Sequence, residues 1–307
     1  MSLILQGLIE KNKIIGKYGV RFLDDYLLGI KKTDFVMIGA PTGTGKSNLA
    51  YQIAFDNSEK LNVHLFALEA DIDEPYERRL FSEYSRLLRT TEFASYTNYR
   101  DFSQGSVTVP KMLETIEKQI MDKYNKLSIH YKEKEFTINT LEERLSTIAS
   151  GNCDMIILDH VDYFDILTDV NENLQVSNIM KKLREINMDW GIPVILISHL
   201  RKKSNRKVII PDIEDLFGTS NKQKQMKTVI LLAPDYENSD PASGIFSTYF
   251  SIPKDRAFGA THLVGQCAYN SHIGRYEDEY SLLRITNFGE TLDKDIGGKP
   301  KWATMGK

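Results

Sequence analysis

The residues with the clearest chemical meaning lie between Gly39 and Ser47, where the chain reads Gly-Ala-Pro-Thr-Gly-Thr-Gly-Lys-Ser. Glycines in such a loop let successive backbone N–H groups face a polyphosphate, and the start of a following helix adds its partial positive charge. Lys46 is placed to reach the β- and γ-phosphates, and the Ser47 hydroxyl is placed to bind Mg²⁺. The expected nucleotide-binding residues are Gly39, Ala40, Pro41, Thr42, Gly43, Thr44, Gly45, Lys46, Ser47 and Asn48.

This loop departs from the usual phosphate-binding pattern at one position. The pattern has a glycine where this chain has Ala40, although Gly39 precedes it. A glycine-rich turn that carries a lysine and a serine by chance is the alternative interpretation. The flanking sequence favours nucleotide binding, because an apolar run at 35–38 precedes the loop and helical spacing of apolar residues at 48–57 follows it.

Three polar residues each follow an apolar run of their own. Asp159 is expected to hold Mg²⁺ through a water, together with Ser47. Glu69 is expected to orient or deprotonate the water that attacks the γ-phosphate. His199 is expected to contact the γ-phosphate and to report its loss. The structural alternatives are acids that merely end a strand or begin a helix, and a histidine that only packs.

Lys254 and Arg256 lie two residues apart at the end of another apolar run, so both side chains point to one side of a strand. Facing the nucleotide of a neighbouring subunit, Arg256 would offer a rigid fork and Lys254 a point charge as the phosphate leaves. The alternative is a solvated basic edge, and the spacing alone does not decide between the two.

Two basic segments are candidates for contact with a nucleic-acid backbone. The first has five basic residues in the seven from Arg201 to Lys207, and the second groups lysines after Gly218. Basic loops near strand ends can follow phosphates without reading sequence, although a charge run is commonly a solvated face. The expected nucleic-acid-binding residues are Arg201, Lys202, Lys203, Arg206, Lys207, Gly218, Thr219, Ser220, Lys222 and Lys224.

The elements that must position these residues alternate along the first 200 residues. Helices are expected at 48–57, from Asp73 as N-cap with Pro75 in the first turn, and at 111–124, 141–149 and 174–190. Strands are expected at 35–38, 63–68, 127–130, 155–158 and 194–198. The polar and aromatic stretch 90–104 is expected to be a loop or insert.

This alternation predicts an α/β fold with a mostly parallel sheet flanked by helices. Ligands of such sheets bind beyond the carboxyl ends of the strands, where the loop, Glu69, Asp159 and His199 all fall. Short strands at 228–232, 248–252 and 264–269 predict an antiparallel C-terminal extension. We expect a helical cover segment at 1–34, an ATPase domain at 35–270, and an extension and tail at 271–307.

Composition and charge limit the class of protein. The 307 residues are 41% hydrophobic and 26% charged, which is typical of a globular protein. No apolar run approaches the roughly eighteen residues of a membrane span, and no signal peptide is apparent. Cys153 and Cys267 lack metal or disulfide spacing, so we expect a cytoplasmic protein. The net charge of −3 means that any nucleic acid must be held by local patches.

Taken in order, the motifs resemble the RecA-type motor domain of DnaB-like replicative hexameric helicases over about residues 17–270. His in Ser198-His199-Leu200-Arg201 is similar to the sensor variant of phage and mitochondrial members. The other matching segments are Tyr18-Gly19-Val20-Arg21-Phe22-Leu23-Asp24, the loop at Gly39–Ser47, Leu68-Glu69, Leu158-Asp159, Asp215-Leu216-Phe217-Gly218-Thr219-Ser220 and Lys254-Asp255-Arg256.

The resemblance implies a RecA-like core that uses ATP and Mg²⁺ to move along single-stranded DNA during replication of a phage or mobile element. It implies catalytic roles for Glu69, His199, Lys254 and Arg256, a hexameric ring, and a primase or loader as partner, with no membrane. Phe217 stands where relatives usually have Arg. Because little of a linker helix fits before residue 17, we expect a weak ring.

Two other hypotheses remain open from the sequence. The chain is alternatively a nucleotide-regulated assembly module, in the manner of recombinase or clock-type RecA-like proteins, without unwinding activity. It is also compatible with one piece of a motor whose ring another polypeptide completes.

Overall fold

A computed structural model describes residues 2–91, 98–132, 134–148, 152–165, 172–200, 209–216, 225–257, 263–286 and 291–293. Its strands are β1 (Ile14–Gly16), β2 (Ile30–Lys31), β3 (Phe35–Ala40), β4 (Val63–Ala67), β5 (Leu127–Tyr131), β6 (Met155–Asp159), β7 (Val194–His199), β8 (Thr228–Asp240), β9 (Ile245–Asp255), β10 (Leu263–Asn270), β11 (Arg275–Thr286) and β12 (Thr291–Asp293).

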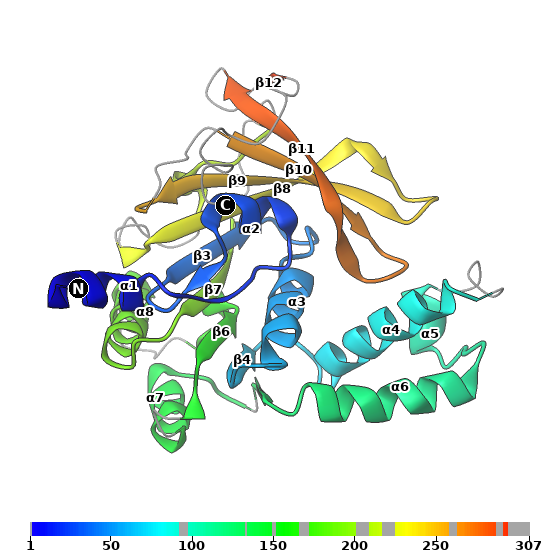
Figure 1. Ribbon diagram of the computed structural model, residues 1–307, viewed down its shortest axis with the longest axis horizontal. Helices are drawn as coiled ribbons and strands as arrows, with labels where there is room; N and C mark the ends of the chain where they lie inside the picture. The colour runs from blue at the N-terminus through cyan, green and yellow to red at the C-terminus, as the bar shows by residue number, and fades with distance from the viewer. Residues whose placement is uncertain are drawn as a thin grey trace.

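Helices alternate with these strands through the first two thirds of the chain (Figure 1). They are α1 (Leu3–Lys11), α2 (Arg21–Leu27), α3 (Lys46–Ser58), α4 (Glu74–Leu88), α5 (Tyr99–Ser103), α6 (Pro110–Lys123), α7 (Ile138–Thr147) and α8 (Glu172–Asp189), with the 3-10 turns η3 (Val161–Tyr163) and η4 (Ile213–Asp215). Among the helices described, none is long and apolar enough to cross a lipid bilayer.

Within the described residues, one large sheet has the strand order β12-β11-β10-β9-β8-β3-β7-β6-β4-β5. The strands from β5 to β8 pair in parallel, and the strands from β8 to β12 pair antiparallel. The predicted α/β fold, with a mostly parallel sheet flanked by helices and an antiparallel C-terminal extension, is therefore confirmed.

The inner parallel strands β3, β6 and β7 are buried on both faces, which explains why they read as largely continuous apolar runs. Successive side chains of β3 enter opposite cores: Val36 and Ile38 pack with α2 and α3, whereas Phe35 and Met37 pack with α7 and α8. The sheet thus has helices on both sides (Figure 1). This double cover fixes the register on which the site depends.

The antiparallel part is larger than the sequence predicted. β8 continues to Asp240, far beyond the expected end at 232, and β11 was not expected. The polar half of β8 is stable as a strand because Asp235 accepts hydrogen bonds from Ser247 at 2.8 Å and from Gln266 at 2.6 Å. Neighbours from β9 and β10 therefore override its low strand propensity.

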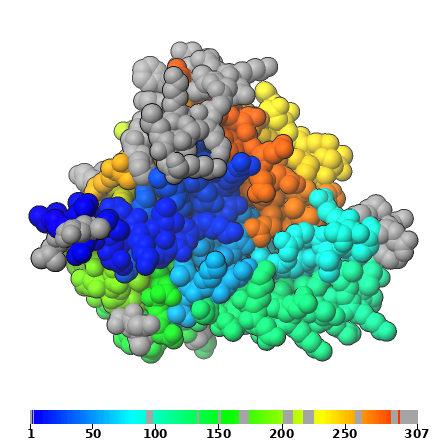
Figure 2. All heavy atoms as spheres, viewed as in Figure 1, coloured from blue at the N-terminus to red at the C-terminus, as the bar shows by residue number. Residues whose placement is uncertain are grey.

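Within the N-terminal segment, α2 covers the sheet. Asp24 stabilises the chain segment that leads into this helix, because its carboxylate accepts hydrogen bonds from the backbone N–H groups of Tyr18 at 2.7 Å and Gly19 at 3.0 Å. Figure 2 shows this segment, in blue, lying across one face of the molecule. The small antiparallel pair of β1 and β2 was not predicted.

Two local expectations are met only in part. The stretch 90–104, expected to be a loop or insert, contains the short helix α5, because Phe102 packs on Phe81 and Tyr84 of α4; residues 92–97 lie outside the described residues. Asp73 does occupy the N-cap position of α4, but its side chain makes no capping hydrogen bond and its φ is 68°. Pro75 lies in the first turn as predicted.

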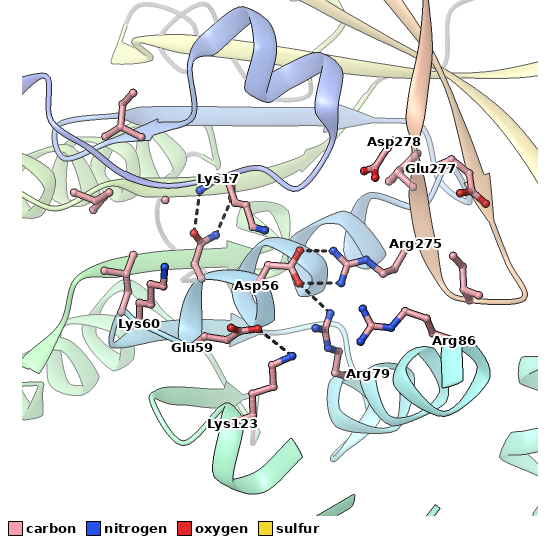
Figure 3. Close-up of a pocket in the computed structure, with 17 residues that line it drawn as sticks. Lys17, Asp56, Glu59, Lys60, Arg79, Arg86, Lys123, Arg275, Glu277 and Asp278 are labelled. Atoms are coloured by element: carbon pink, nitrogen blue, oxygen red, sulfur yellow. Dashed lines mark hydrogen bonds and ion pairs between the residues drawn. The ribbon is translucent and has the colours of Figure 1, made fainter. Parts of the chain in front are cut away.

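A polar cavity of about 610 Å³ lies at the C-terminal end of α3 (Figure 3). At its centre the buried carboxylate of Asp56 pairs with Arg79 of α4 and with Arg275 of β11. Lys123 of α6 pairs with Glu59 at 3.1 Å. These ion pairs fasten the helical layer and the antiparallel extension to α3, the helix that begins at the predicted phosphate-binding loop.

Gly265 of β10 lies directly against Phe22 of α2. A Cβ at Gly265 would lie 2.2 Å from the ring of Phe22, which is fully buried. We expect Gly265→Ala to lower the free energy of unfolding by about 1–3 kcal/mol, because the ring must move within a packed core. Urea denaturation measures this change.

The matched control is Gly7→Ala in α1, where an added Cβ meets nothing within 4 Å. This variant should be neutral or slightly stabilising, since Ala favours a helix. Equal stability of Gly265→Ala and the unchanged protein would contradict the packing argument.

Two histidines form a pair at the β4–β5 edge of the sheet. His64 Nδ1 lies 3.0 Å from His130 Nε2. Burial, the His64 ring and the charge of Arg144 lower the pKa of His130 from 6.5 to about 4. Burial also lowers the pKa of His64. This edge is therefore most stable while both rings are neutral.

We expect stability to fall as the pH drops from about 6.5 toward 4, because the unfolded chain binds a proton on His130 at higher pH than the folded chain does. The variant His130→Gln removes this proton site, so its Tm should decline less across the same window. Thermal unfolding followed by circular dichroism tests this. An unaltered slope in His130→Gln, matching that of the control His272→Gln in a surface turn, would argue against it.

Candidate functional site

The carboxyl ends of four neighbouring parallel strands bring the predicted site residues together. Ala40, the last residue of β3, is paired with His199 of β7. Ala67 of β4 is paired with Asp159 of β6, and the backbone N–H of Leu68 donates to the carbonyl of Asp159 at 2.7 Å. The loop, Glu69, Asp159 and His199 therefore share one edge of the sheet, as expected.

The loop between β3 and α3 has the backbone of a phosphate-binding turn. Gly43 and Gly45 have φ values of 81° and 86°, a region that favours glycine. Lys46 begins α3 directly after Gly45. Positive-φ glycines next to a helix start make a concavity suited to anions.

The structure explains the departure at Ala40. This residue lies in β3 and is fully buried, so it belongs to the strand before the turn. Gly39 has a packing role, because a Cβ there would lie 2.7–2.9 Å from the side chains of Leu216, Leu231 and Leu200. Packing of these leucine side chains therefore explains why a glycine stands at position 39, before the loop.

Lys46 and Glu69 face each other across the mouth of the loop. The Lys46 side chain is 6% exposed, and its Nζ lies 3.6 Å from Glu69 Oε2. The Glu69 side chain is 37% exposed. A cavity of about 360 Å³ opens here, lined by both residues, by the loop and by Arg78. An ammonium group held at a glycine-rich loop is the arrangement that binds β- and γ-phosphates.

Asp159 and Ser47 fit a Mg²⁺ site. Asp159 is 1% exposed, and its Oδ1 makes no hydrogen bond within the described part of the chain. Burial raises the pKa of Asp159 to about 6, while a hydrogen bond from Ser47 and the charges of His160 and Lys46 oppose that rise. A buried carboxylate oxygen beside a hydroxyl supplies the hard oxygen ligands that Mg²⁺ prefers.

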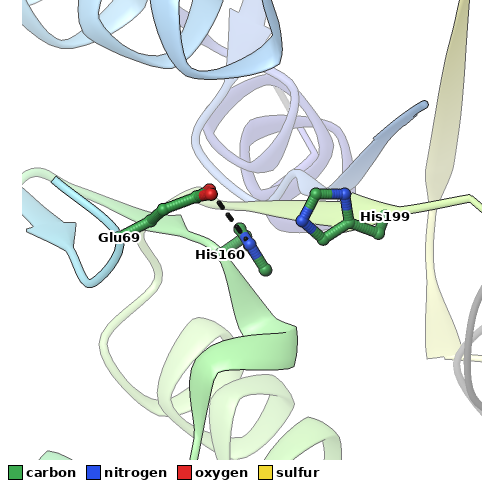
Figure 4. A group of neighbouring side chains, drawn as sticks. All are labelled: Glu69, His160 and His199. Atoms are coloured by element: carbon green, nitrogen blue, oxygen red, sulfur yellow. Dashed lines mark ion pairs between the residues drawn. The ribbon is translucent and has the colours of Figure 1, made fainter. Parts of the chain in front are cut away.

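His199 lies beside the loop and beside a second histidine. Its Nδ1 is 3.5 Å from Thr42 Oγ1, and its ring is 4.1 Å from that of His160. Burial and the nearby charges of His160 and Lys46 lower the pKa of His199. Figure 4 shows His199, His160 and Glu69 converging on one spot, and their ligand atoms all lie within 4.8 Å of one another.

Sequence reasoning missed three residues at this edge. His160 directly follows Asp159, and its Nε2 lies 3.2 Å from Glu69 Oε2. Asp162 accepts the backbone N–H of His199 at 2.8 Å. Burial, the Glu69 charge and a hydrogen bond to Glu69 raise the pKa of Tyr163. The available signal was the cluster Asp-His-Val-Asp-Tyr that continues the predicted metal-binding strand.

Three further residues predicted to bind nucleotide differ in the contacts that they make. The Thr44 hydroxyl is buried and makes no hydrogen bond to any described residue. Asn48 was predicted to bind nucleotide, and its side-chain amide donates to the Tyr269 hydroxyl at 3.0 Å, which ties α3 to β10. Pro41 begins the turn and accepts a hydrogen bond from the backbone N–H of Thr44 at 3.4 Å.

Lys254 and Arg256 lie at the opposite edge of the sheet from the loop. Lys254 is paired with Val229 near the start of β8. The backbone N–H of Arg256 donates to the carbonyl of Lys227, whose own N–H donates to Phe35, the first residue of β3. The six residues of β3 separate this edge from the loop, a distance of roughly 17–20 Å. These two side chains are therefore not brought to the site of their own chain.

The residues predicted to bind nucleic acid lie outside the described residues. They are Arg201, Lys202, Lys203, Arg206, Lys207, Gly218, Thr219, Ser220, Lys222 and Lys224. The residues from which both segments start are described. Leu200 pairs with Leu216 in an isolated antiparallel bridge, and Leu200 donates its N–H to Ala40 at 3.2 Å.

Comparison with known proteins gives a family and a fold. The model of the DnaB-like helicase C-terminal domain matches residues 17–278. A solved structure described as an ATPase domain is similar to this chain with a TM-score of 0.71 and 17% identity, over 90% of this chain and 95% of that one.

A second solved structure, a DnaB-like replicative helicase described with its interactions with primase, has a TM-score of 0.69 and 17% identity over 89% of this chain. The match covers 64% of that helicase, so it spans just under two thirds of its length. No curated protein matches the sequence.

Proposed function

This chain belongs to the DnaB-like helicase C-terminal domain family, and from that premise we propose that it is an ATP-dependent motor acting on single-stranded DNA in replication. One observation carries the proposal. Lys46, Glu69, Asp159 and His199 meet at the carboxyl edge of a parallel sheet beside a loop with positive-φ glycines. Phosphoryl transfer needs these parts in one place.

The roles follow from position and chemistry. The loop amides and Lys46 would hold the phosphates of ATP, with Lys46 exchanging its contact with Glu69 for the β- and γ-phosphates. Ser47 and Asp159 would hold Mg²⁺, which neutralises phosphate charge when bound. Glu69 would then accept the proton of the attacking water, and His199 would contact the γ-phosphate.

Lys254 and Arg256 would act on the nucleotide of a neighbouring copy, since the length of β3 separates them from their own loop. An arginine supplied from a neighbour stabilises the charge that develops on the transferred phosphoryl group. This role requires an oligomer, and we propose a hexameric ring. A primase or loader as partner, a phage or mobile-element origin and a cytoplasmic location remain proposals of the same kind.

Movement of DNA would begin at the bridge between Leu200 and Leu216. Both predicted DNA-contacting segments leave the described structure at these two residues, and Leu200 is bonded to the last residue of β3. A shift of His199 would therefore move Leu200 and, through the bridge, Leu216, the two residues from which these segments start. We propose that the basic residues at 201–207 and 218–224 contact the phosphates of single-stranded DNA.

ATP turnover with and without single-stranded DNA tests the proposed motor. We expect DNA to stimulate turnover severalfold, and we expect Glu69→Gln to lower kcat by roughly 100-fold or more, because the general base is lost. Nucleotide binding, measured by calorimetry, should survive Glu69→Gln and be lost in Lys46→Ala.

These measurements distinguish a DNA-dependent motor from the alternative function. Turnover that ignores DNA would favour a nucleotide-regulated assembly module without unwinding activity. Full turnover in Glu69→Gln would refute the proposed catalytic role of that carboxylate.

Complementation tests the action of Arg256 across a subunit boundary. Arg256→Ala alone should lower kcat by about 10³-fold or more. A mixture of Arg256→Ala and Glu69→Gln protomers contains boundaries at which one copy supplies Glu69 and the other supplies Arg256, so turnover should partly recover. Native mass measurement establishes that mixed assemblies form. Mixed assemblies that stay inactive would show that Arg256 does not act in this way.

A further inference from the structure

His160 is buried at the centre of the site in an unusual setting. It is 1% exposed, and neither ring nitrogen makes a hydrogen bond to any described residue. Each nitrogen instead lies near a carboxylate: Nε2 is 3.2 Å from Glu69 Oε2 and Nδ1 is 3.6 Å from Asp162 Oδ2 (Figure 4 shows the Glu69 contact). Burying an imidazole without hydrogen bonds costs stability, so this placement needs an explanation beyond packing.

Asp162 connects His160 to the end of β7. Its Oδ2 accepts a hydrogen bond from the Ser198 hydroxyl at 3.0 Å and another from the His199 backbone N–H at 2.8 Å. The same oxygen is the one that faces His160 Nδ1. Glu69, His160, Asp162 and the His199 backbone therefore form one continuous chain of polar contacts.

From this geometry we propose that His160 is a positioning residue that holds Glu69 in place and couples it to the end of β7 through Asp162. The inference rests on the proposed roles of Glu69 and His199 and assigns a further residue to the same site. When His199 moves with the γ-phosphate, Asp162 and His160 transmit the shift to the Glu69 carboxylate.

Glu69 needs such support because of its position. It follows β4 in a loop and its side chain is 37% exposed, so its rotamer is not fixed by packing. A second charged neighbour, Lys46, is the residue expected to engage the phosphates. Tyr163 offers a hydroxyl from the exposed rim. His160 is also buried and, unlike Lys46, has no proposed contact with the phosphates. A catalytic group displaced by about 1 Å can lose 100-fold in rate.

Two substitutions at His160 separate the effect of its ring nitrogen Nε2 from the effect of its size. His160→Phe keeps an aromatic ring but removes Nε2, and we expect kcat to fall roughly 10- to 100-fold. His160→Gln keeps an N–H group near the Nε2 position and should retain more activity than the Phe variant. The KM for ATP and the affinity for nucleotide should change less than about threefold in both variants, because neither touches the loop.

A double-mutant cycle with Glu69 is the deciding measurement. If His160 acts through Glu69, then His160→Phe combined with Glu69→Gln should be no slower than Glu69→Gln alone. A second full loss on top of the first would overturn the proposal, as would a His160→Phe variant with unchanged kcat. Should His160→Phe fail to fold, the same cycle with Asp162→Asn decides in the same way.

His64→Phe is the matched control. This residue is also a buried histidine, but it lies on β4 in contact with His130. Its variant should keep kcat within about twofold, and an equal loss there would overturn the specific role of His160. The proposed function fails separately, through full turnover in Glu69→Gln, so the two failures are distinguishable.

Discussion

The parallel, in-register pairing of β4, β6, β7 and β3 is the constraint on which the candidate site depends. Because Ala67 lies opposite Asp159 and Ala40 lies opposite His199, residues from distant parts of the chain reach one edge together. A shift of one residue in any pairing would turn each side chain to the other face of the sheet. Helices on both faces prevent that shift, since each face of β3 belongs to a separate apolar core. The positions of the loop residues are thus fixed by side-chain packing in the two cores, away from the loop itself.

That edge also concentrates buried ionisable groups, and these link stability to ligand binding. Lys46, Asp159 and His160 are almost fully buried. A buried charge is tolerated when a partner or hydrogen bonds compensate for lost hydration, and removal of one partner typically costs roughly 3–5 kcal/mol. Here the compensation is incomplete, because Asp159 Oδ1 and both nitrogens of His160 lack hydrogen bonds to described residues. Ligands that satisfy such groups stabilise the folded state to which they bind.

The sequence was sufficient to predict elements that depend on local residue patterns, but not features that depend on contacts between residues distant in the chain. The parallel strands and the loop were predictable, because a strand buried on both faces is apolar throughout and a phosphate loop needs glycine, Lys46 and Ser47 at fixed spacing. The polar half of β8 was not, since Asp235 is stabilised by residues of β9 and β10. His160 was not identified either, because its contacts with Glu69 and Asp162 depend on register and on the turn η3. The predicted roles of Lys254, Arg256 and the two basic segments stay predictions.

The placement of Lys254 and Arg256 bears on how copies of the chain must meet. The proposed loop site lies at the carboxyl edge of β3, whereas these two residues lie at the end of β9, across β8 and level with the first residues of β3. If they complete a site, the amino edge of the sheet in one copy must face the carboxyl edge in the next. Such a contact joins two different surfaces, so it cannot be a two-fold dimer. Repetition of a head-to-tail contact closes into a ring or extends into a filament. On the proposed roles of Lys254 and Arg256, the separation of Arg256 from Lys46 within one chain therefore requires a head-to-tail assembly, of which the proposed ring is the closed form.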